Sequence, residues 1–412
     1  MLHIKNEQGA SKVKGLYKQM AKIWLIIFAA LASMIAPFSI DTYLPSFPAI
    51  EMHYGVSREL LTSSMGAYLA AFALTTLVWG PLADRFGRKY IAIVSLFGFG
   101  LASMGVALAP GFDGFMIFRI FQGMLAGGVI IGARAMVRDY FPAKEAQKTM
   151  AIIMMLFAIA PAIAPVIGGY LQTLYGWESI FWFLTAYALV SLFILVFFIV
   201  ETQDLEHVQS IHPKPLLASY WSALSHPRFI KLVLAQSIMF GGFFVYIAGS
   251  ASLMFDHLKL GPEDFWIQFV PMVGGVILGA IVSHRITDLY APNHIAHFSY
   301  VLAGFAATGG LLSALYLEPS IISVIPFISF YAFALSLSLP VLSILALDCL
   351  PHKRGMAASL QSLLQMGMAA LVAIILVPIV HESVFEMAMM QLVLWLIAVF
   401  FWVNVARSAE GR

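Results

Sequence analysis

The sequence predicts an all-α membrane protein with twelve transmembrane helices, and three observations support that prediction. Of the 412 residues, 61% are hydrophobic and only 11% are charged, whereas a soluble globular chain has about 25% charged residues. The mean hydropathy is +0.89, so a fold in water would expose large apolar surfaces. Apolar runs of about 20 residues, enough to cross a hydrocarbon core of about 30 Å, recur along the chain.

The apolar runs place the twelve spans in order along the chain. We expect them at residues 22–44, 58–80, 90–109, 114–136, 147–170, 178–200, 228–250, 264–284, 295–316, 321–347, 353–379 and 385–406. The first run is too long for the core of a signal peptide, and no small-residue cleavage site follows it. It is therefore expected to remain as the first helix.

The distribution of Lys and Arg predicts the orientation. With the N-terminus inside, twenty of the 23 basic residues fall on the inner side, while Arg58 and Lys259 fall outside and Arg119 lies within a span. Inner loops of membrane proteins carry an excess of Lys and Arg. Both termini are therefore expected in the cytoplasm, and an odd number of spans would destroy the charge bias.

The chain also predicts two related halves. The longest internal hydrophilic stretch begins at residue 201 and separates six spans from six, which gives an N-terminal bundle at 1–200, a central loop at 201–227 and a C-terminal bundle at 228–412. Asp139, Pro142 and Lys144 before span five recur as Asp348, Pro351 and Lys353 before span eleven. Parallel six-helix repeats with a substrate site at their interface are a known transporter plan.

Composition and motifs argue against several other classes. A net charge of +2 without a basic patch gives no reason to expect a nucleic-acid partner. The single cysteine, Cys349, excludes a disulfide framework or a cysteine-based metal site. His381-Glu382 has no second histidine at zinc spacing. We expect no enzyme activity, no metal and no cofactor, and we expect a monomer whose partners are lipid, protons and a small molecule.

The loop between spans two and three has the sequence GPLADRFGRK at residues 80–89. A tight basic turn would explain its glycines and cations but not Asp84. The segment closely resembles the G-x-L-a-D-r-x-G-r-k loop of the major facilitator superfamily, in which such residues form a cytoplasmic network that favours the outward-open state. The resemblance implies a conformational switch made of Gly80, Asp84, Arg85, Gly87, Arg88 and Lys89, with Asp139 as a partner from span four.

Three further segments extend the resemblance over essentially the whole chain. Arg119-Ile-Phe-Gln-Gly resembles the R-x-x-q-G of span four in proton antiporters, and the APAIAPVIGG run at residues 160–169 resembles the span-five signature of drug antiporters. The run has Ala164 where glycine is common, which keeps the position small. Asp41-Thr-Tyr-Leu-Pro resembles the D-x-Y-L-P of the Bcr/CflA group of multidrug exporters.

Asp41 and Arg119 are expected to couple transport to protons. An ionisable group in the membrane costs roughly 2.5–3.5 kcal/mol and usually faces a cavity or a partner. At about 1.5 Å per residue both lie at a similar depth near the outer boundary, so they could meet or share a water-filled cavity. Asp41 could then bind and release a proton near neutral pH, with Arg119 stabilising its ionised form. The alternatives are an interfacial Asp41 already in water and a purely structural role for Arg119.

Span five and the central aromatic residues complete the predicted site. Pro161 and Pro165 interrupt backbone hydrogen bonding, and Gly168 and Gly169 permit close packing, so this segment is expected to act as a hinge, or simply to pack. Flexible and aromatic side chains suit loose recognition of lipophilic molecules, although most such residues here would face lipid or core. The expected substrate contacts are Tyr43, Met154, Phe157, Phe240 and Tyr246.

These observations favour a drug/proton antiporter of the bacterial inner membrane. An exporter of an endogenous metabolite or siderophore is the nearest alternative, and a proton-driven uptake symporter is less favoured. The alternative from another class is a non-transporting membrane sensor or lipid-handling protein, which would release no protons in detergent when substrate is added.

Overall fold

The computed structural model describes residues 2–203 and 220–410, and within them the side chains of residues 20–203, 220–351 and 353–405. Part of the predicted central loop at 201–227 therefore lies outside the described residues, as do the side chains of most of the predicted basic N-terminal tail. Among the described residues, twelve helical segments are long and apolar enough to cross a membrane. The predicted fold class and number of spans are confirmed.

The main helices follow the predicted spans closely. They are α1 (Leu2–Asp41), α2 (Phe47–Tyr54), α3 (Arg58–Phe86), α4 (Arg88–Ala107), α5 (Phe112–Tyr140), α6 (Ala143–Tyr175), α7 (Glu178–Phe198), α9 (Pro227–Ala248), α10 (Trp266–Ile286), α11 (Pro292–Tyr316), α12 (Ile321–Asp348), α13 (Arg354–Leu371), α14 (Val377–Val380) and α15 (Val384–Glu410). Short turns η1 (Leu44–Ser46), η3 (Ser252–His257), η4 (Pro262–Phe265), η5 (Pro351–Lys353) and η6 (Val372–Leu376) connect or interrupt them.

Two predicted spans differ from the structure toward their C-terminal ends. The prediction for span one continues to residue 44, but α1 ends at Asp41 and the chain turns into η1. Pro45 has no N–H to donate to the carbonyl of Asp41, which explains why the α-helical hydrogen bonding ends there. The span predicted at 353–379 is interrupted by the π-helical turn η6. Pro378 has no N–H to donate within the helix, which accounts for the irregular hydrogen bonding before it.

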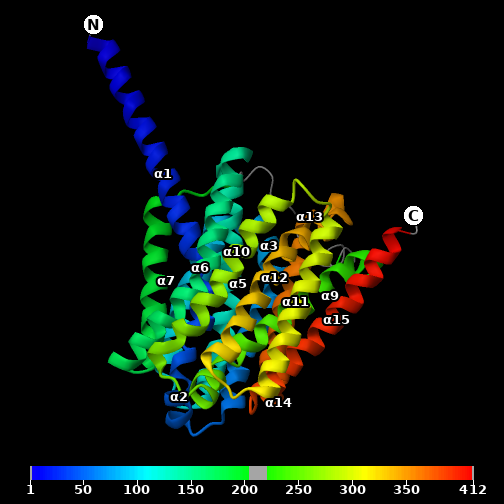
Figure 1. Ribbon diagram of the computed structural model, residues 1–412. Coiled ribbons are helices and arrows are strands. Elements are labelled where there is room, and N and C mark those ends of the chain that lie inside the picture. The colour runs from blue at the N-terminus through cyan, green and yellow to red at the C-terminus, as the bar shows by residue number, and fades with distance from the viewer. Residues whose placement is uncertain (1, 204–219, 411–412) are drawn as a thin grey trace.

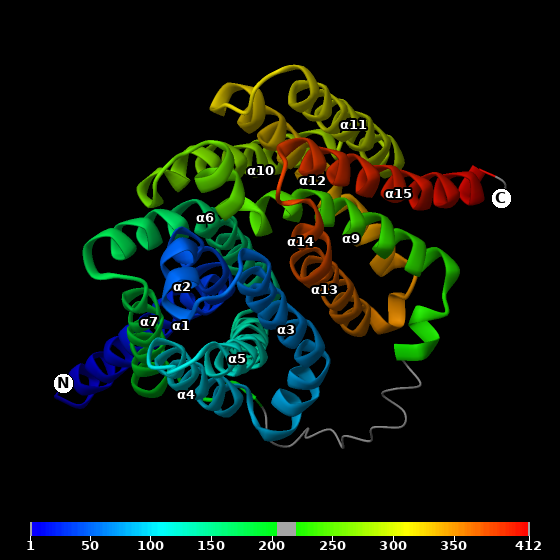
Figure 2. The same ribbon diagram turned by 90° about the horizontal axis from the view of Figure 1, so that it is seen from below.

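The helices pack as two groups, the first six spans (α1 to α7) and the last six (α9 to α15). In the view along the helices, α3 lies beside α13 and α6 lies beside α10, and these pairs join the two groups (Figure 2). Both chain ends lie toward one end of the molecule, which we call the terminus face, and the other end is the opposite face (Figure 1). Pairs of helices from different groups therefore enclose the centre of the protein.

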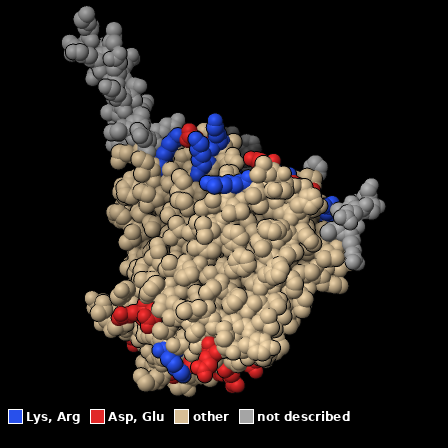
Figure 3. Space-filling view, in the orientation of Figure 1, with Lys and Arg blue, Asp and Glu red and all other residues tan. Residues whose placement is uncertain are grey.

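On the face that Figure 3 shows, charged side chains gather at the two ends of the molecule. In the space-filling view, Lys and Arg gather at the terminus face and Asp and Glu dominate the opposite face, with an uncharged band between them (Figure 3). An uncharged band of this kind matches the hydrocarbon core of a bilayer. The exceptions that matter are the charged side chains inside the band.

Candidate functional site

Arg119 of α5 is fully buried, and aromatic rings surround it instead of acids. Its guanidinium carbon lies 4.4 Å from the centre of the Tyr43 ring and 4.8 Å from that of Tyr68. Nη1 donates to Gln122 at 2.9 Å, and Gln122 donates in turn to Ser103 at 2.8 Å. Nε and Nη2 have no hydrogen-bond partner among the described residues. Cation–π contacts and one charge-assisted hydrogen bond therefore hold this cation in the membrane interior.

Asp41 is the last residue of α1 and is only 3% exposed. Its carboxyl group makes no ion pair and no hydrogen bond with any described side chain. The backbone around it is rigidly held, because Thr42 donates its hydroxyl to the carbonyl of Phe38 and Tyr43 lies in hydrogen-bond contact with Ser64 at 3.3 Å. The interfacial alternative, in which Asp41 is already in water, does not agree with this burial.

Asp41 and Arg119 do not form the direct contact that the sequence left open. No ion pair joins them within the described part of the chain, and the guanidinium instead lies against the Tyr43 and Tyr68 rings. Tyr43 lies two residues after Asp41, and its ring contacts the Arg119 guanidinium. It therefore connects the chain segment that holds Asp41 with the buried cation. Of the predicted substrate residues, Tyr43 is thus fully buried against Arg119.

The loop between α3 and α4 brings together its predicted acids and cation. Arg88 contacts Asp84 at 2.6 Å and Asp139 at 3.0 Å, and donates to the carbonyl of Ala83 at 2.9 Å. Its side chain is 10% exposed, so three acceptors surround a nearly buried guanidinium. Gly87 has a φ of 103°, which favours glycine at this turn. The other residues of the predicted switch lie outside this cluster of charges. Lys89 donates to the carbonyl of Val196, and Arg85 lies over the Phe86 ring. A Cβ on Gly80 would meet no other atom within 4 Å.

Glu201 belongs to this network, and sequence reasoning missed it. Its carboxylate accepts from the backbone N–H groups of Arg88 and Lys89 at 3.2 and 3.0 Å. Acids are favoured at the start of a helix, where backbone N–H groups are free. Glu201 lies after the sixth span, so only the fold brings it to the start of α4.

The predicted hinge segment lies where several chain segments meet. Pro161 and Pro165 are inside the continuous helix α6. A Cβ on Gly168 would lie 1.8 Å from the Thr42 carbonyl oxygen, and one on Gly169 would lie 2.2 Å from the carbonyl oxygen of Pro262 in the last six spans. The two glycines therefore allow α6 to approach the Asp41 segment on one side and η4 on the other.

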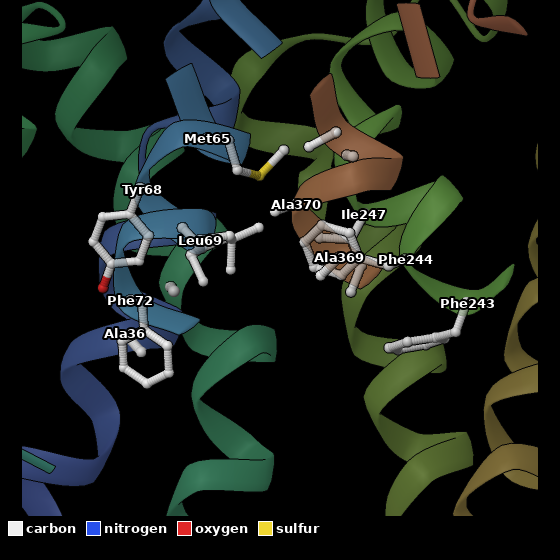
Figure 4. Packing of buried hydrophobic residues seen from close by; sticks show 14 of the residues in the cluster. Ala36, Met65, Tyr68, Leu69, Phe72, Phe243, Phe244, Ile247, Ala369 and Ala370 are labelled. Carbon is white, nitrogen blue, oxygen red and sulfur yellow. The ribbon is translucent and has the colours of Figure 1, made fainter. Parts of the chain in front are cut away.

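Apolar side chains from both groups of spans face one another at the centre. Figure 4 shows Ala36, Met65, Tyr68, Leu69 and Phe72 on one side, opposite Phe243, Phe244, Ile247, Ala369 and Ala370 on the other. The predicted contact Phe240 packs against Phe244, with ring centres 5.9 Å apart, and Tyr246 is 2% exposed. Met154 is 49% exposed and Phe157 is half-buried, both on α6. Tyr43 and Tyr246 thus belong to the buried core and Phe240 packs against it, whereas Met154 is largely exposed.

Comparison of the sequence with known proteins identifies the family of this chain. The model of the Major Facilitator Superfamily matches residues 29–373. The chain belongs to the major facilitator superfamily. Its resemblance to that superfamily, seen in the loop at residues 80–89, is therefore confirmed across most of the chain.

Relatives within the superfamily include several named for drug resistance. The chain is 26% identical to an uncharacterized transporter, YdgK, of Bacillus subtilis, covering 85% of this chain and 88% of that one. It is 25% identical to a bicyclomycin resistance protein homolog of Haemophilus influenzae, covering 65% and 67%. It is 28% identical to the multidrug resistance protein MdtL of Klebsiella pneumoniae, covering 71% and 73%.

Solved structures of the superfamily share the fold. A bacterial homolog of the human lysosomal transporter Spinster, in an inward-facing and unoccupied conformation, matches with a TM-score of 0.72 over 95% of this chain and 97% of that one, at 17% identity. At that identity the match establishes the fold alone.

Among the described residues, the ion pairs between the two groups of spans lie at the opposite face. Arg58 at the start of α3 contacts Glu51 of α2 and reaches Asp256 of the last six spans at 2.8 Å. Glu59 contacts His381, which follows α14, at 3.1 Å. These residues join the first six spans to the last six, as expected of a superfamily member closed at that face. Sequence reasoning gave them no role, because each is an ordinary residue at the end of a helix.

Proposed function

We propose that this protein exports lipophilic small molecules across the bacterial inner membrane in exchange for protons, by alternating access. The observation that carries the proposal is the burial of the Asp41 carboxyl group without a partner. A buried ionised group with no partner is costly, so Asp41 is an acid whose charge must be compensated at each stage of a transport cycle.

A bound proton and a bound substrate would each remove the free-energy cost of the buried, ionised Asp41 carboxylate. A proton neutralises the carboxylate, whereas a substrate with a cationic or hydrogen-bond-donating group compensates for its charge. Because one carboxyl group cannot accept both at once, binding of the substrate expels the proton. Inward flow of protons then drives the substrate outward. Arg119 stabilises the ionised form from behind the two tyrosine rings without neutralising it.

Alternating access would reverse which face is closed. The contacts of Arg58 and Glu59 hold the opposite face together, so we assign this arrangement to the inward-facing state. In this assignment the terminus face is cytoplasmic, and the bundles at 1–200 and 228–412 rock about the hinge on α6. In the other state the network of Asp84, Arg88 and Asp139 would meet the last six spans.

The substrate class follows from the apolar centre and from the relatives. Aromatic, aliphatic and methionine side chains bind lipophilic molecules with little demand on shape, and the Haemophilus influenzae and Klebsiella pneumoniae relatives are named for drug resistance. We assign the contacts to Tyr43, Met154, Phe157, Phe240 and Tyr246, in a protein that works as a monomer and needs only the proton gradient.

The decisive experiment is substrate-induced proton release. Bicyclomycin and ethidium are added to the detergent-solubilised protein in weakly buffered solution, and the pH change is recorded for the wild type and for Asp41→Asn. We expect proton release from the wild type and none from the variant, while Asp113→Asn, at an exposed acid on the opposite face, keeps it. Undiminished release from Asp41→Asn would exclude Asp41 as the proton site.

A further inference from the structure

Arg134 is a second cation inside α5, and it lacks a strong partner. It lies six residues before the end of the helix at Tyr140. Its Nε is buried and has no hydrogen-bond partner among the described residues. Nη2 contacts only the sulfur of Met154, at 3.9 Å, and a thioether is a weak acceptor.

Its environment differs from that of the other arginines of the first six spans. Arg119 lies against two tyrosine rings, Arg88 contacts two carboxylates, and Arg138, one turn further along α5, has a side chain that is 68% exposed to solvent. Arg134 is half-buried, and no acid and no aromatic ring within the described residues compensates its charge. An ionisable side chain in a membrane span without a partner points to a functional site.

The packing of α5 shows which way Arg134 points. Gly132 lies against Ala92 of α4. Two residues further along a helix, a side chain has turned by about 200°, so Arg134 points away from α4. The contact with Met154 shows that it points toward α6, which also packs against α10 of the last six spans. The guanidinium is therefore directed toward a helix that borders the last six spans.

We propose that Arg134 binds an anionic group of the transported molecule, such as a carboxylate, with the Met154 side chain against the adjoining apolar part. This inference rests on the proposed function and extends its substrate class to lipophilic acids and zwitterions. A guanidinium presents parallel N–H donors that fit the two oxygens of a carboxylate. Such a substrate would supply the acceptors that Arg134 lacks.

A pair of probes that differ only at the acid group tests this proposal. 1-Naphthoate and 1-naphthamide share the same ring system, and their binding to the full-length protein is measured by equilibrium dialysis in detergent, where no pH gradient can redistribute a weak acid. We expect the wild type to bind naphthoate about tenfold more tightly than naphthamide. Arg134→Gln should bind both equally, and Arg134→Lys should keep part of the preference.

Controls separate this site from general charge effects. Arg354→Gln removes an arginine with a 62% exposed side chain at the terminus face and should leave the preference unchanged. A preference that survives in Arg134→Gln, or a wild type that does not prefer naphthoate, would overturn the proposal. If adding phosphatidylglycerol displaces naphthoate, Arg134 holds a lipid phosphate and the assignment to substrate is wrong.

The outcome can be distinguished from that of the proposed function. Proton release on adding bicyclomycin or ethidium reports on Asp41, whereas the ratio of naphthoate to naphthamide binding reports on Arg134. If the wild type releases no protons but still prefers naphthoate, the protein has an anion site at Arg134 and is not a proton antiporter. If the wild type releases protons but does not prefer naphthoate, it is a proton antiporter without an anion site at Arg134.

Discussion

Gly168 of α6 and Thr42 at the end of α1 are packed so closely that no side chain fits between them. A Cβ on Gly168 would lie 1.8 Å from the Thr42 carbonyl oxygen. Thr42 directly follows Asp41, so this contact fixes α6 against the segment that holds the buried acid. The proposed hinge and the proposed proton site are therefore parts of one packed unit.

Replacing Gly168 by alanine should force α6 away from Thr42. Overpacking of this kind costs about 1–3 kcal/mol, and we expect a lower unfolding temperature in detergent together with weaker substrate-induced proton release. Gly274→Ala is the matched control, because nothing lies within 4 Å of a Cβ at that position of α10. Equal unfolding temperatures for the two variants would contradict the close contact.

The sequence predicted the elements of this fold well because its strongest signals are local. Apolar runs mark the spans, and the Asp84 loop keeps its spacing whatever surrounds it. The contacts of Glu201 with the start of α4, and of Arg58 with Asp256, join residues far apart along the chain. No local pattern encodes such pairs, since their partners are chosen by the packing of whole helices.

The contacts around Arg119 also join residues far apart along the chain, so the sequence predicted them only in part. Depth along two helices predicted that Asp41 and Arg119 lie at a similar level, but depth does not determine which way a side chain points. The early end of α1 turns Tyr43 toward Arg119, and Tyr68 of α3 covers another side. Arg134 was counted among the inner basic residues because it is near the end of a span, although its Nε is buried.

Binding of a cationic substrate should depend on pH through Asp41. As the pH falls, a proton occupies the carboxyl group and the substrate loses its anionic partner, so the affinity for ethidium should decrease; as the pH rises, the affinity should increase to a plateau. In Asp41→Asn the affinity should be low and independent of pH. Fluorescence titrations with ethidium between pH 5 and pH 9, values chosen to span the usual range of perturbed carboxyl groups, test this directly.

Asp41→Glu provides the control for that titration. It retains an acid, so a pH dependence should remain even if the added methylene group alters the affinity. A wild type whose ethidium affinity is the same at all pH values would argue against competition at Asp41.

The Arg88 network should contribute measurably to stability. Removing the guanidinium by Arg88→Gln leaves Asp84 and Asp139 without their shared cation, and charge-assisted hydrogen bonds of this kind contribute about 1.5–3 kcal/mol. We expect a lower unfolding temperature. Arg138→Gln should change it little, because the Arg138 side chain is 68% exposed and lies 3.4 Å from Asp139. Similar losses in both variants would show that the burial of Arg88 does not matter.

The contact between Arg58 and Asp256 should bias the protein toward the arrangement closed at the opposite face. Arg58 is held by Glu51 within the first six spans and reaches Asp256 of the last six at 2.8 Å. Because Asp256 is half-exposed, loss of this ion pair should cost about 0.2–1 kcal/mol, which corresponds to a roughly 1.4- to fivefold increase in the population open at this face. Asp256→Asn is the variant that tests it.

Spin labels on opposite groups of spans can measure that shift. Met52 and Ile322 are 85% and 84% exposed, and cysteines at both positions in a Cys349→Ser background report the distance across the opposite face by electron–electron double resonance. Asp256→Asn should increase the fraction of long distances. Glu318→Gln removes an exposed acid near the end of α11 that has no ion pair in the described structure, and it should leave the distribution unchanged. If both variants give the wild-type distribution, the ion pair between Arg58 and Asp256 does not hold the face closed, and the remaining contacts, such as that of Glu59 with His381, do so without it.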